Sequence, residues 1–152
     1  MGLFSFLSNK LPIDTAIIEQ AIAHLEQQTS AELRVVVEQK ANIDKVENAA
    51  ILCANQLFDE LNMRETAERN GVLLYLSFKP HYVAVIGDEG IHQKVGEAFW
   101  QDVYKAMCID CQQGDYTQAI CHAIQTLESP LARYFPYQAS DRNELSNEVV
   151  IK

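Results

Sequence analysis

Oxygen-bearing side chains stand at three places in the sequence where an apolar segment begins or ends. Glu32 opens one such segment, Asn70 precedes a second, and Asp88 and Glu89 follow a third. Carboxylate and amide oxygens are the ligands that Ca²⁺ and Mg²⁺ prefer in proteins. A cation site therefore depends on whether the fold brings these distant positions together.

Three apolar segments predict strands. Residues 33–38 alternate between apolar and polar side chains, as a strand with one buried face does. Residues 72–76 are apolar on both faces, which is typical of a central strand covered on both sides. Residues 82–86 follow after a short loop that contains Pro80, so we expect an antiparallel hairpin with the preceding strand.

Four segments have the apolar period of amphipathic helices. They lie within residues 14–25, 44–61, 91–106 and 115–127. Asp14 is a candidate cap of the first, and Asp44 with Glu47 has the spacing of a capping box for the second. Pro130 and Pro136 predict that the last helix ends before them.

The order of these elements predicts a fold. A helix between the first two strands implies that those strands are parallel and joined by a right-handed crossover. We expect an α/β domain, a three-layer α/β/α sandwich in which a small mixed β-sheet is flanked by about four helices. In that topology Glu32, Arg69 with Asn70, and Asp88 with Glu89 lie at one edge of the sheet.

Each of these residues also has a purely structural interpretation. Asp88 is a candidate helix cap, and Glu89 suits the first turn of a helix because of the helix dipole. Glu32 fits an exposed strand start, and Asn70 fits a turn in which Gly71 has a positive φ. The sequence leaves both interpretations open.

Composition restricts the classes of partner. The chain has 152 residues and a formal net charge of −9, with no cluster of basic residues. Binding to nucleic acid is therefore not expected. No apolar stretch reaches the ~18 residues of a membrane span, and no basic residue precedes the apolar residues near the start. We expect a cytoplasmic protein whose apolar start, residues 3–7, contacts either its own core, a membrane or a partner.

Other motifs are few. The sequence lacks GxGxxG, Walker, GxSxG and HExxH patterns, so no organic cofactor is expected. Cys108 and Cys111 have CxxC spacing, but they follow residues that predict the end of a helix. Unreactive thiols are therefore favoured over a redox or metal site.

Three motifs in order resemble the TPM domain, which is named after a thylakoid lumen protein, a photosystem II repair protein and a modulator of a nematode acetylcholine receptor. They are residues 29–35 (TSAELRV), 69–74 (RNGVLL) and 86–91 (IGDEGI), followed by the pair Phe99-Trp100. The likeness is greatest to short bacterial single-domain members, whose tail resembles residues 141–148, and it extends from about Ile13 to Val149.

The resemblance implies an α/β/α domain with acidic and amide groups at one sheet edge. Some members are Ca²⁺ binders, a plant member is an acid phosphatase, and others look like non-catalytic partners of membrane complexes. Glu32, Asn70 and Asp88 match the motif positions of the family. The tail positions of the short members correspond to Asp141, Asn143 and Glu144.

Two residues depart from the family pattern. Ala31 stands where many members have Gly, and Ser146 stands where the tail usually has Pro. The first changes how closely a ligand approaches the backbone before Glu32, and the second makes the tail less rigid. We divide the chain into an N-terminal segment (1–12), a TPM-like domain (13–136) and a polar C-terminal tail (137–152) that docks on the domain.

The sequence thus predicts a binding or interaction module with a Ca²⁺ or Mg²⁺ site at one sheet edge, linked to maintenance of a membrane complex. Its expected metal ligands are Glu32, Asn70, Asp88 and Glu89, with contributions from Arg69, Asp141, Asn143 and Glu144. We expect a protein partner, at the inner membrane surface if the protein is peripheral there. The alternative is a metal-dependent acid phosphatase of low specificity that uses a metal-activated water, because no nucleophile lies beside a base.

Overall fold

A computed structural model describes residues 11–138 and 147–152. Its elements, in chain order, are α2 (Thr15–Glu26), β1 (Glu32–Lys40), α3 (Ala49–Glu60), β2 (Gly71–Lys79), β3 (His81–Gly87), α4 (Glu89–Val95), α5 (Glu97–Gln112), α6 (Tyr116–Tyr134) and β4 (Val150–Ile151). All three predicted strands are present, and each of the four segments predicted to be helical contains helix.

The four described strands form one mixed sheet in the order β3-β2-β1-β4. β1 runs parallel to β2 and to β4, whereas β2 and β3 form an antiparallel hairpin. The predicted mixed sheet with a parallel first pair is therefore confirmed. The strand β4 was not expected from the polar sequence of the tail.

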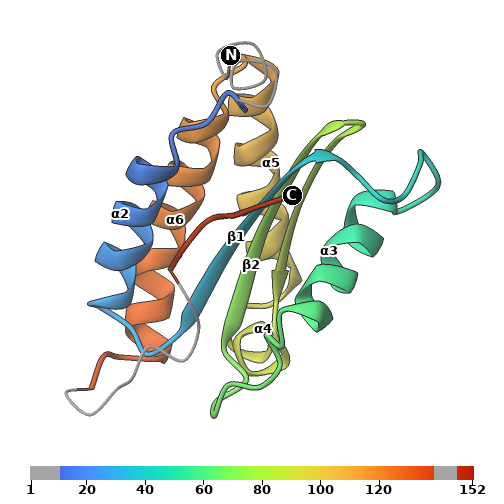
Figure 1. The fold of residues 1–152 in the computed structure, drawn as a ribbon. Coiled ribbons are helices and arrows are strands. Elements are labelled where there is room, and N and C mark those ends of the chain that lie inside the picture. Colours follow the sequence, from blue (N-terminus) through green and yellow to red (C-terminus); the bar gives the residue numbers. More distant parts are fainter. Residues whose placement is uncertain (1–10, 139–146) are drawn as a thin grey trace.

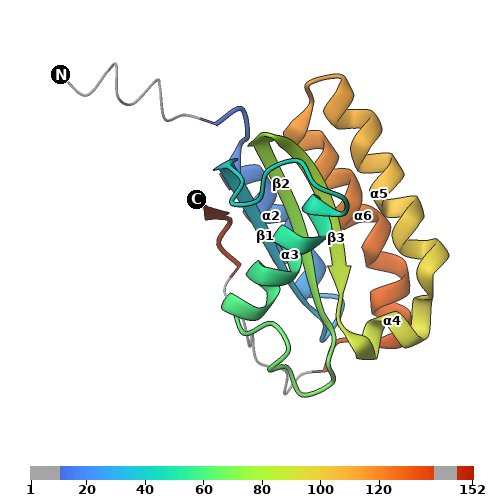
Figure 2. The same ribbon diagram turned by 90° about the vertical axis from the view of Figure 1, so that its right-hand side faces the viewer.

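Helices cover both faces of the sheet (Figure 1). α2, α5 and α6 pack on one face, where alternate residues of the central strands, such as Val35 and Leu74, join their core. α3 packs on the other face over the intervening residues, such as Val36 and Tyr75. The turned view shows the three layers and places α4 at the end of the sheet where β3 stops (Figure 2). The three-layer α/β/α sandwich is confirmed.

The second helix begins later than predicted. α3 starts at Ala49, and its N-cap Asn48 has a left-handed backbone (φ 60°) and makes no capping hydrogen bond through its side chain. Asp44 and Glu47 lie in the preceding loop, so the predicted capping box is wrong. The two residues have the spacing of a capping box, but the chain is not yet helical there.

The predicted third helix is two helices. Gly96 has φ 79°, a left-handed conformation that L-residues with a side chain rarely adopt. It ends α4 after Val95 and begins α5 at Glu97. The break changes the direction of the chain, so that α4 lies at the end of the sheet and α5 runs back along its face (Figure 2).

The last helix continues past the residue expected to stop it. Pro130 lies inside α6, which extends to Tyr134. An interior proline removes one helical hydrogen bond, but Leu127 and Leu131 on either side of it are fully buried in the core. Burial of this apolar face outweighs the proline, because packing decides most helical stability in proteins.

The described end of the chain returns to the sheet. Val150 pairs with Val36, and Lys152 exchanges backbone hydrogen bonds with Val37 and Gln39 at 2.9 Å each. β4 thus covers part of the outer edge of β1. In the described part of the chain, none of the helices has the length and apolar character that crossing a bilayer requires.

Candidate cation site

The strand ends that carry the predicted ligands meet at one end of the sheet (Figure 1). Glu32, the first residue of β1, lies opposite Gly71, the first residue of β2. The N–H of Glu32 donates to the carbonyl of Asn70 (3.3 Å), and the N–H of Asp88 donates to the carbonyl of Gly71 (2.8 Å). The topology therefore places the backbones of all three positions side by side.

Asp88 caps α4, as its sequence position indicated. Its side chain is fully buried, and its Oδ1 accepts the N–H of Glu89 at 2.7 Å. Arg69 donates from Nε to Oδ2 (3.0 Å) and from Nη2 to Oδ1 (3.3 Å). Arg64 donates from Nη1 to Oδ1 at 3.4 Å. One buried carboxylate therefore joins the loop before β2 to the start of α4.

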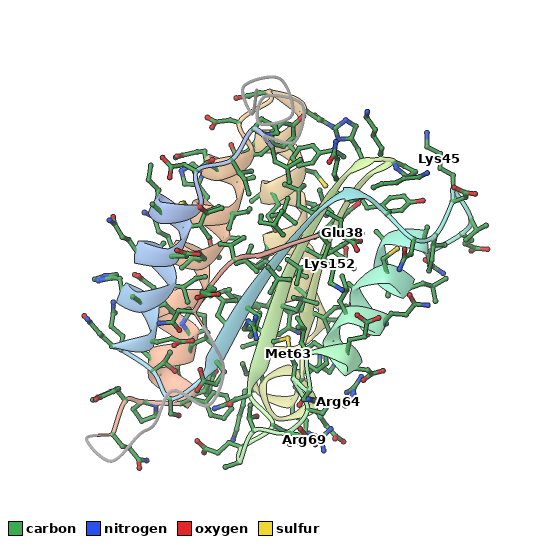
Figure 3. The ribbon with its side chains drawn as sticks, in the orientation of Figure 1. Glu38, Lys45, Met63, Arg64, Arg69 and Lys152 are labelled. Carbon is green, nitrogen blue, oxygen red and sulfur yellow. The ribbon has the colours of Figure 1, made fainter. Side chains whose placement is uncertain are left out.

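The two arginines bring positive charge to this end of the sheet. Figure 3 shows Arg64 and Arg69 next to each other beside α4. Their side chains are 47% and 43% exposed, so both reach solvent while contacting Asp88. The hydrogen bond to Asp88, and the charge of that carboxylate, raise the pKa of Arg69. Arg64 also pairs with the exposed Asp59.

Among the predicted ligands that the structure describes, Asn70 has a buried side-chain acceptor without a hydrogen bond. It is 1% exposed, and its backbone N–H donates to Oγ1 of Thr66 at 3.0 Å. Its side-chain Oδ1 is buried and has no hydrogen-bond partner among the residues that the structure describes. Leaving a buried acceptor unpaired costs about 1–3 kcal/mol, so such atoms are uncommon. This oxygen is available to a ligand.

Glu32 belongs to a pair of carboxyl groups. It is 3% exposed, and its carboxyl group is hydrogen-bonded to that of Glu26 at the end of α2. Burial, and then the charge of Glu32, raise the pKa of Glu26 to about 8, although the N–H of Leu33 donates to its Oε2 (3.2 Å) and opposes the shift. Because the pKa of Glu26 lies near 8, the pair of carboxyl groups holds one proton at neutral pH.

Of the remaining predicted ligands, Glu89 is described and lies outside this buried group. The Glu89 side chain is 65% exposed and faces Arg69 at 3.6 Å. Asp141, Asn143 and Glu144 lie outside the described residues. Within residues 11–138 and 147–152, no three His, Cys, Asp or Glu side chains form a group that could hold a metal ion. A cation there would depend on the Asn70 oxygen in addition to carboxylates.

The glycines of the GDEG segment allow this close packing. A Cβ on Gly87 would lie 2.1 Å from the ring of Trp100. A Cβ on Gly90 would lie 2.1 Å from the carbonyl oxygen of Glu68 and 2.7 Å from that of Arg69. α4 therefore contacts the loop before β2 directly.

The positive φ that the sequence predicted at Gly71 occurs instead at Arg69 (φ 52°), so that prediction is wrong.

The CxxC pair lies in the last turns of α5, as predicted. All four cysteines of the chain are free thiols. Burial, and then the nearby Cys108, raise the pKa of Cys111 to about 11. A thiol with this pKa stays protonated at neutral pH and is a poor nucleophile.

Sequence reasoning missed three contributors to the site. Arg64 and Thr66 lie in an irregular loop whose path no periodic pattern predicts, and Glu26 lies at a helix end far from the strand motifs. Of the three residues, Glu26 was the easiest to predict, because only a short connection separates it from Glu32 in the sequence.

Comparisons with known proteins agree with this architecture. A family model described as the TPM domain matches residues 6–129. Among solved structures, the chain is similar to the NMR structure of the BA42 protein from the psychrophilic bacterium Bizionia argentinensis, with 31% identity and a TM-score of 0.80. That match covers 91% of this chain and 92% of the BA42 chain. A comparison with curated proteins gives no match.

The family match includes the strand ends that carry Glu32, Asn70 and Asp88, and the structural match covers nearly the whole of both chains. The chain belongs to the TPM domain family.

Proposed function

We propose that this TPM domain is a binding module that takes a divalent cation, Ca²⁺ or Mg²⁺, at the end of the sheet that carries Asn70. The observation that carries the proposal is the buried Asn70 Oδ1, which has no hydrogen-bond partner among the described residues. The N–H of Glu32 donates to the carbonyl of Asn70, and the N–H of Asp88 donates to the carbonyl of the next residue, Gly71. Amide and carboxylate oxygens make a hard ligand set that suits these cations.

In this proposal, the two arginine side chains at the site compete with the cation for Asp88. Arg64 and Arg69 neutralise Asp88 when no cation is bound, and each is exposed enough to turn away into solvent. A cation that approaches Asp88 competes with both guanidinium groups. Replacing Arg64 by Gln should therefore tighten cation binding, most strongly at low ionic strength.

Calorimetric titration with Ca²⁺ and with Mg²⁺ tests the proposal. The wild-type protein should bind one of the two cations with measurable heat, and Asn70→Ala should weaken that binding at least tenfold. Gln56→Ala, an exposed polar position on α3, is the matched control and should bind like the wild type. If Asn70→Ala is folded and binds with unchanged affinity, the proposed ligand set is wrong.

A metal-dependent acid phosphatase is the second candidate. The observation in its favour is the pair of guanidinium groups beside the carboxylates, because arginine binds phosphate in a bidentate manner. Hydrolysis of p-nitrophenyl phosphate in Mg²⁺ tests it. A phosphatase should lose activity in Arg64→Gln, although the same change tightens cation binding. If the wild-type protein does not hydrolyse this ester, the phosphatase proposal is wrong and only the binding-module proposal remains.

The expected protein partner at a membrane surface and the cytoplasmic location stay predictions. Their support is the family membership and the lack of any spanning helix among the described residues.

A further inference from the structure

The outer edge of β3 has unpaired backbone groups. β3 is the terminal strand of the sheet, with β2 on its inner side. The N–H of Asp88 donates to the carbonyl of Gly71, its partner across the hairpin. Hydrogen-bonded and non-hydrogen-bonded residues alternate along antiparallel strands, so Ile86, Ala84 and Tyr82 also bond β2. The N–H and C=O groups of Val83 and Val85 therefore point outward. Among the described residues, none makes a hydrogen bond with them.

A groove runs along this edge. Its volume is about 440 Å³, which is in the range of ligand pockets. Its floor is β3, and its walls are the first part of α3 with the preceding loop on one side and α5 on the other. Apolar and aromatic side chains dominate its lining, including Val46, Ala49, Val83, Val85, Trp100 and Tyr104.

Three common protections of an edge strand are missing from the described residues Tyr82–Gly87 of β3. Proteins block exposed edges with charged side chains, prolines or bulges. The residues from Tyr82 to Gly87 include no charged residue and no proline, and their pairing with β2 is continuous. Val46 and Tyr104 on the two walls are 59% and 40% exposed. The surface is therefore apolar, and it presents backbone donors and acceptors in the spacing of a strand.

A second copy of this chain suits the groove poorly. Its own β3 lies between the same two walls, so α3 and α5 of both copies would meet before the strand edges could pair. The net charge of −9 also opposes self-association. A single extended chain without flanking helices has neither obstacle.

We propose that the outer edge of β3 binds an extended peptide segment of a partner protein, which adds to the sheet as a further strand antiparallel to β3. The outward groups of Val83 and Val85 supply the main-chain hydrogen bonds, and the apolar walls receive alternate side chains. This surface is separate from the candidate cation ligands, so the inference does not depend on the proposed function.

Charge at the two ends of the groove indicates the charge pattern of an antiparallel peptide. Lys45 lies on the loop beyond the β2–β3 turn end of the sheet (Figure 3), whereas Glu97 begins α5 just after α4, at the opposite end (Figure 1). An antiparallel strand begins near Glu97 and ends near Lys45. The peptide therefore has a basic residue at its start, apolar residues at alternate positions, and an acidic residue at its end.

The test uses a seven-residue peptide in which valine alternates with threonine, with lysine first and glutamate last. Trp100 is the only tryptophan of the chain and lines the groove, so its fluorescence reports binding. Amide hydrogen exchange locates the peptide. The amides of Val83 and Val85 should become at least tenfold more protected, while those of Tyr82 and Ala84, which already bond β2, should not change.

Two matched controls make the test specific. The same peptide with proline at its central positions should bind at least tenfold more weakly, because proline cannot donate to the edge. A peptide with its terminal charges exchanged should bind more weakly to the wild type and should recover in the double variant Lys45→Glu, Glu97→Lys. Both residues are exposed, so the variant should fold normally.

Two results would overturn the inference. One is peptide binding that leaves exchange at Val83 and Val85 unchanged, or that tolerates the prolines. The other is protection of these two amides in the free protein that grows with protein concentration, because that would identify a second copy as the occupant.

Discussion

The guanidinium of Arg69 makes two hydrogen bonds to the carboxylate of Asp88, at 3.0 and 3.3 Å, across 19 residues of sequence. The same carboxylate caps α4 through the N–H of Glu89. The contact joins the loop before β2 to the helix after β3, so it sets the shape of the sheet end where the candidate cation site lies.

We predict that the charge of Asp88 stabilises the fold beyond its role as a cap. Asp88→Asn keeps an N-cap acceptor but loses the ionic hydrogen bonds, and should lower the free energy of unfolding by about 1–3 kcal/mol. Asp88→Ala also loses the cap and should cost about 1 kcal/mol more. Urea denaturation in EDTA measures both. Asp59→Asn, which removes an exposed partner of Arg64, is the control and should change stability by less than about 0.5 kcal/mol. Equal effects of Asp88→Asn and Asp59→Asn would contradict this view of the buried pair.

Replacing Gly90 in α4 by alanine should cost more stability than replacing Gly114 in the turn between α5 and α6. A Cβ there would meet the carbonyl oxygen of Glu68 at 2.1 Å, so α4 or the loop must move, and Gly90→Ala should cost about 3 kcal/mol. Gly114 has a positive φ but no atom within 4 Å of an added Cβ, so Gly114→Ala should cost only about 1 kcal/mol. Thermal denaturation of the two variants compares them. A smaller loss for Gly90→Ala than for Gly114→Ala would show that α4 does not contact this loop.

Glu26 should make the metal-free protein less stable as pH rises. Its pKa in the fold is raised from 4.5 to about 8 by burial and by Glu32. The protonated form is therefore favoured by folding, and its stabilisation is complete below about pH 4.5 and lost as pH rises through 8. Glu26→Gln mimics the protonated state. Relative to this variant, the wild type should lose on the order of 1–3 kcal/mol between pH 5 and pH 8, which is less than the full pKa shift because the side chain is only partly buried.

Urea midpoints of both proteins at pH 5, 6.5 and 8, in EDTA, provide the measurement. Taking the difference between the two proteins cancels the titration of the histidines. Parallel pH profiles would contradict a shared proton between Glu26 and Glu32.

The short strand β4 should contribute more than its length suggests. Ending the chain after Glu148 removes the pairing with Val36 and the backbone hydrogen bonds of Lys152 to Val37 and Gln39. We expect a loss of about 2–4 kcal/mol, because several backbone hydrogen bonds and the buried Val149 are lost together. Lys152→Ala removes only the exposed pair with Glu60 and should change stability by less than about 0.5 kcal/mol. A truncated protein as stable as the wild type would mean that β4 does not stabilise the sheet.

The fold was predictable because its signals are local and periodic. The apolar segment of β2, the hairpin to β3 and the helix between β1 and β2 together determine the mixed sheet and the layer on each face. The misplaced boundaries have identifiable causes. Gly96 has a positive φ that composition does not reveal, and Pro130 stays helical because Leu127 and Leu131 are buried on either side of it.

The candidate site was predictable only at the level of the backbone. Strand topology placed Glu32, Asn70 and Asp88 together, but it could not show which side chains surround them. Arg64 reaches Asp88 from an irregular loop, and Glu26 reaches Glu32 from the end of α2. Such contacts depend on loop paths and on helix packing, for which a single sequence carries no periodic signal.

Terbium luminescence is a direct test of whether the Asn70 oxygen belongs to a cation site. Trp100 packs against Gly87, the residue before Asp88, so a Tb³⁺ ion bound at this end of the sheet lies near the only tryptophan. Excitation of Trp100 should produce Tb³⁺ emission that Ca²⁺ displaces, and that emission should be lost in Asn70→Ala but kept in Gln56→Ala. Emission of equal strength and affinity in a folded Asn70→Ala protein, or no sensitised emission from the wild type, would contradict the account.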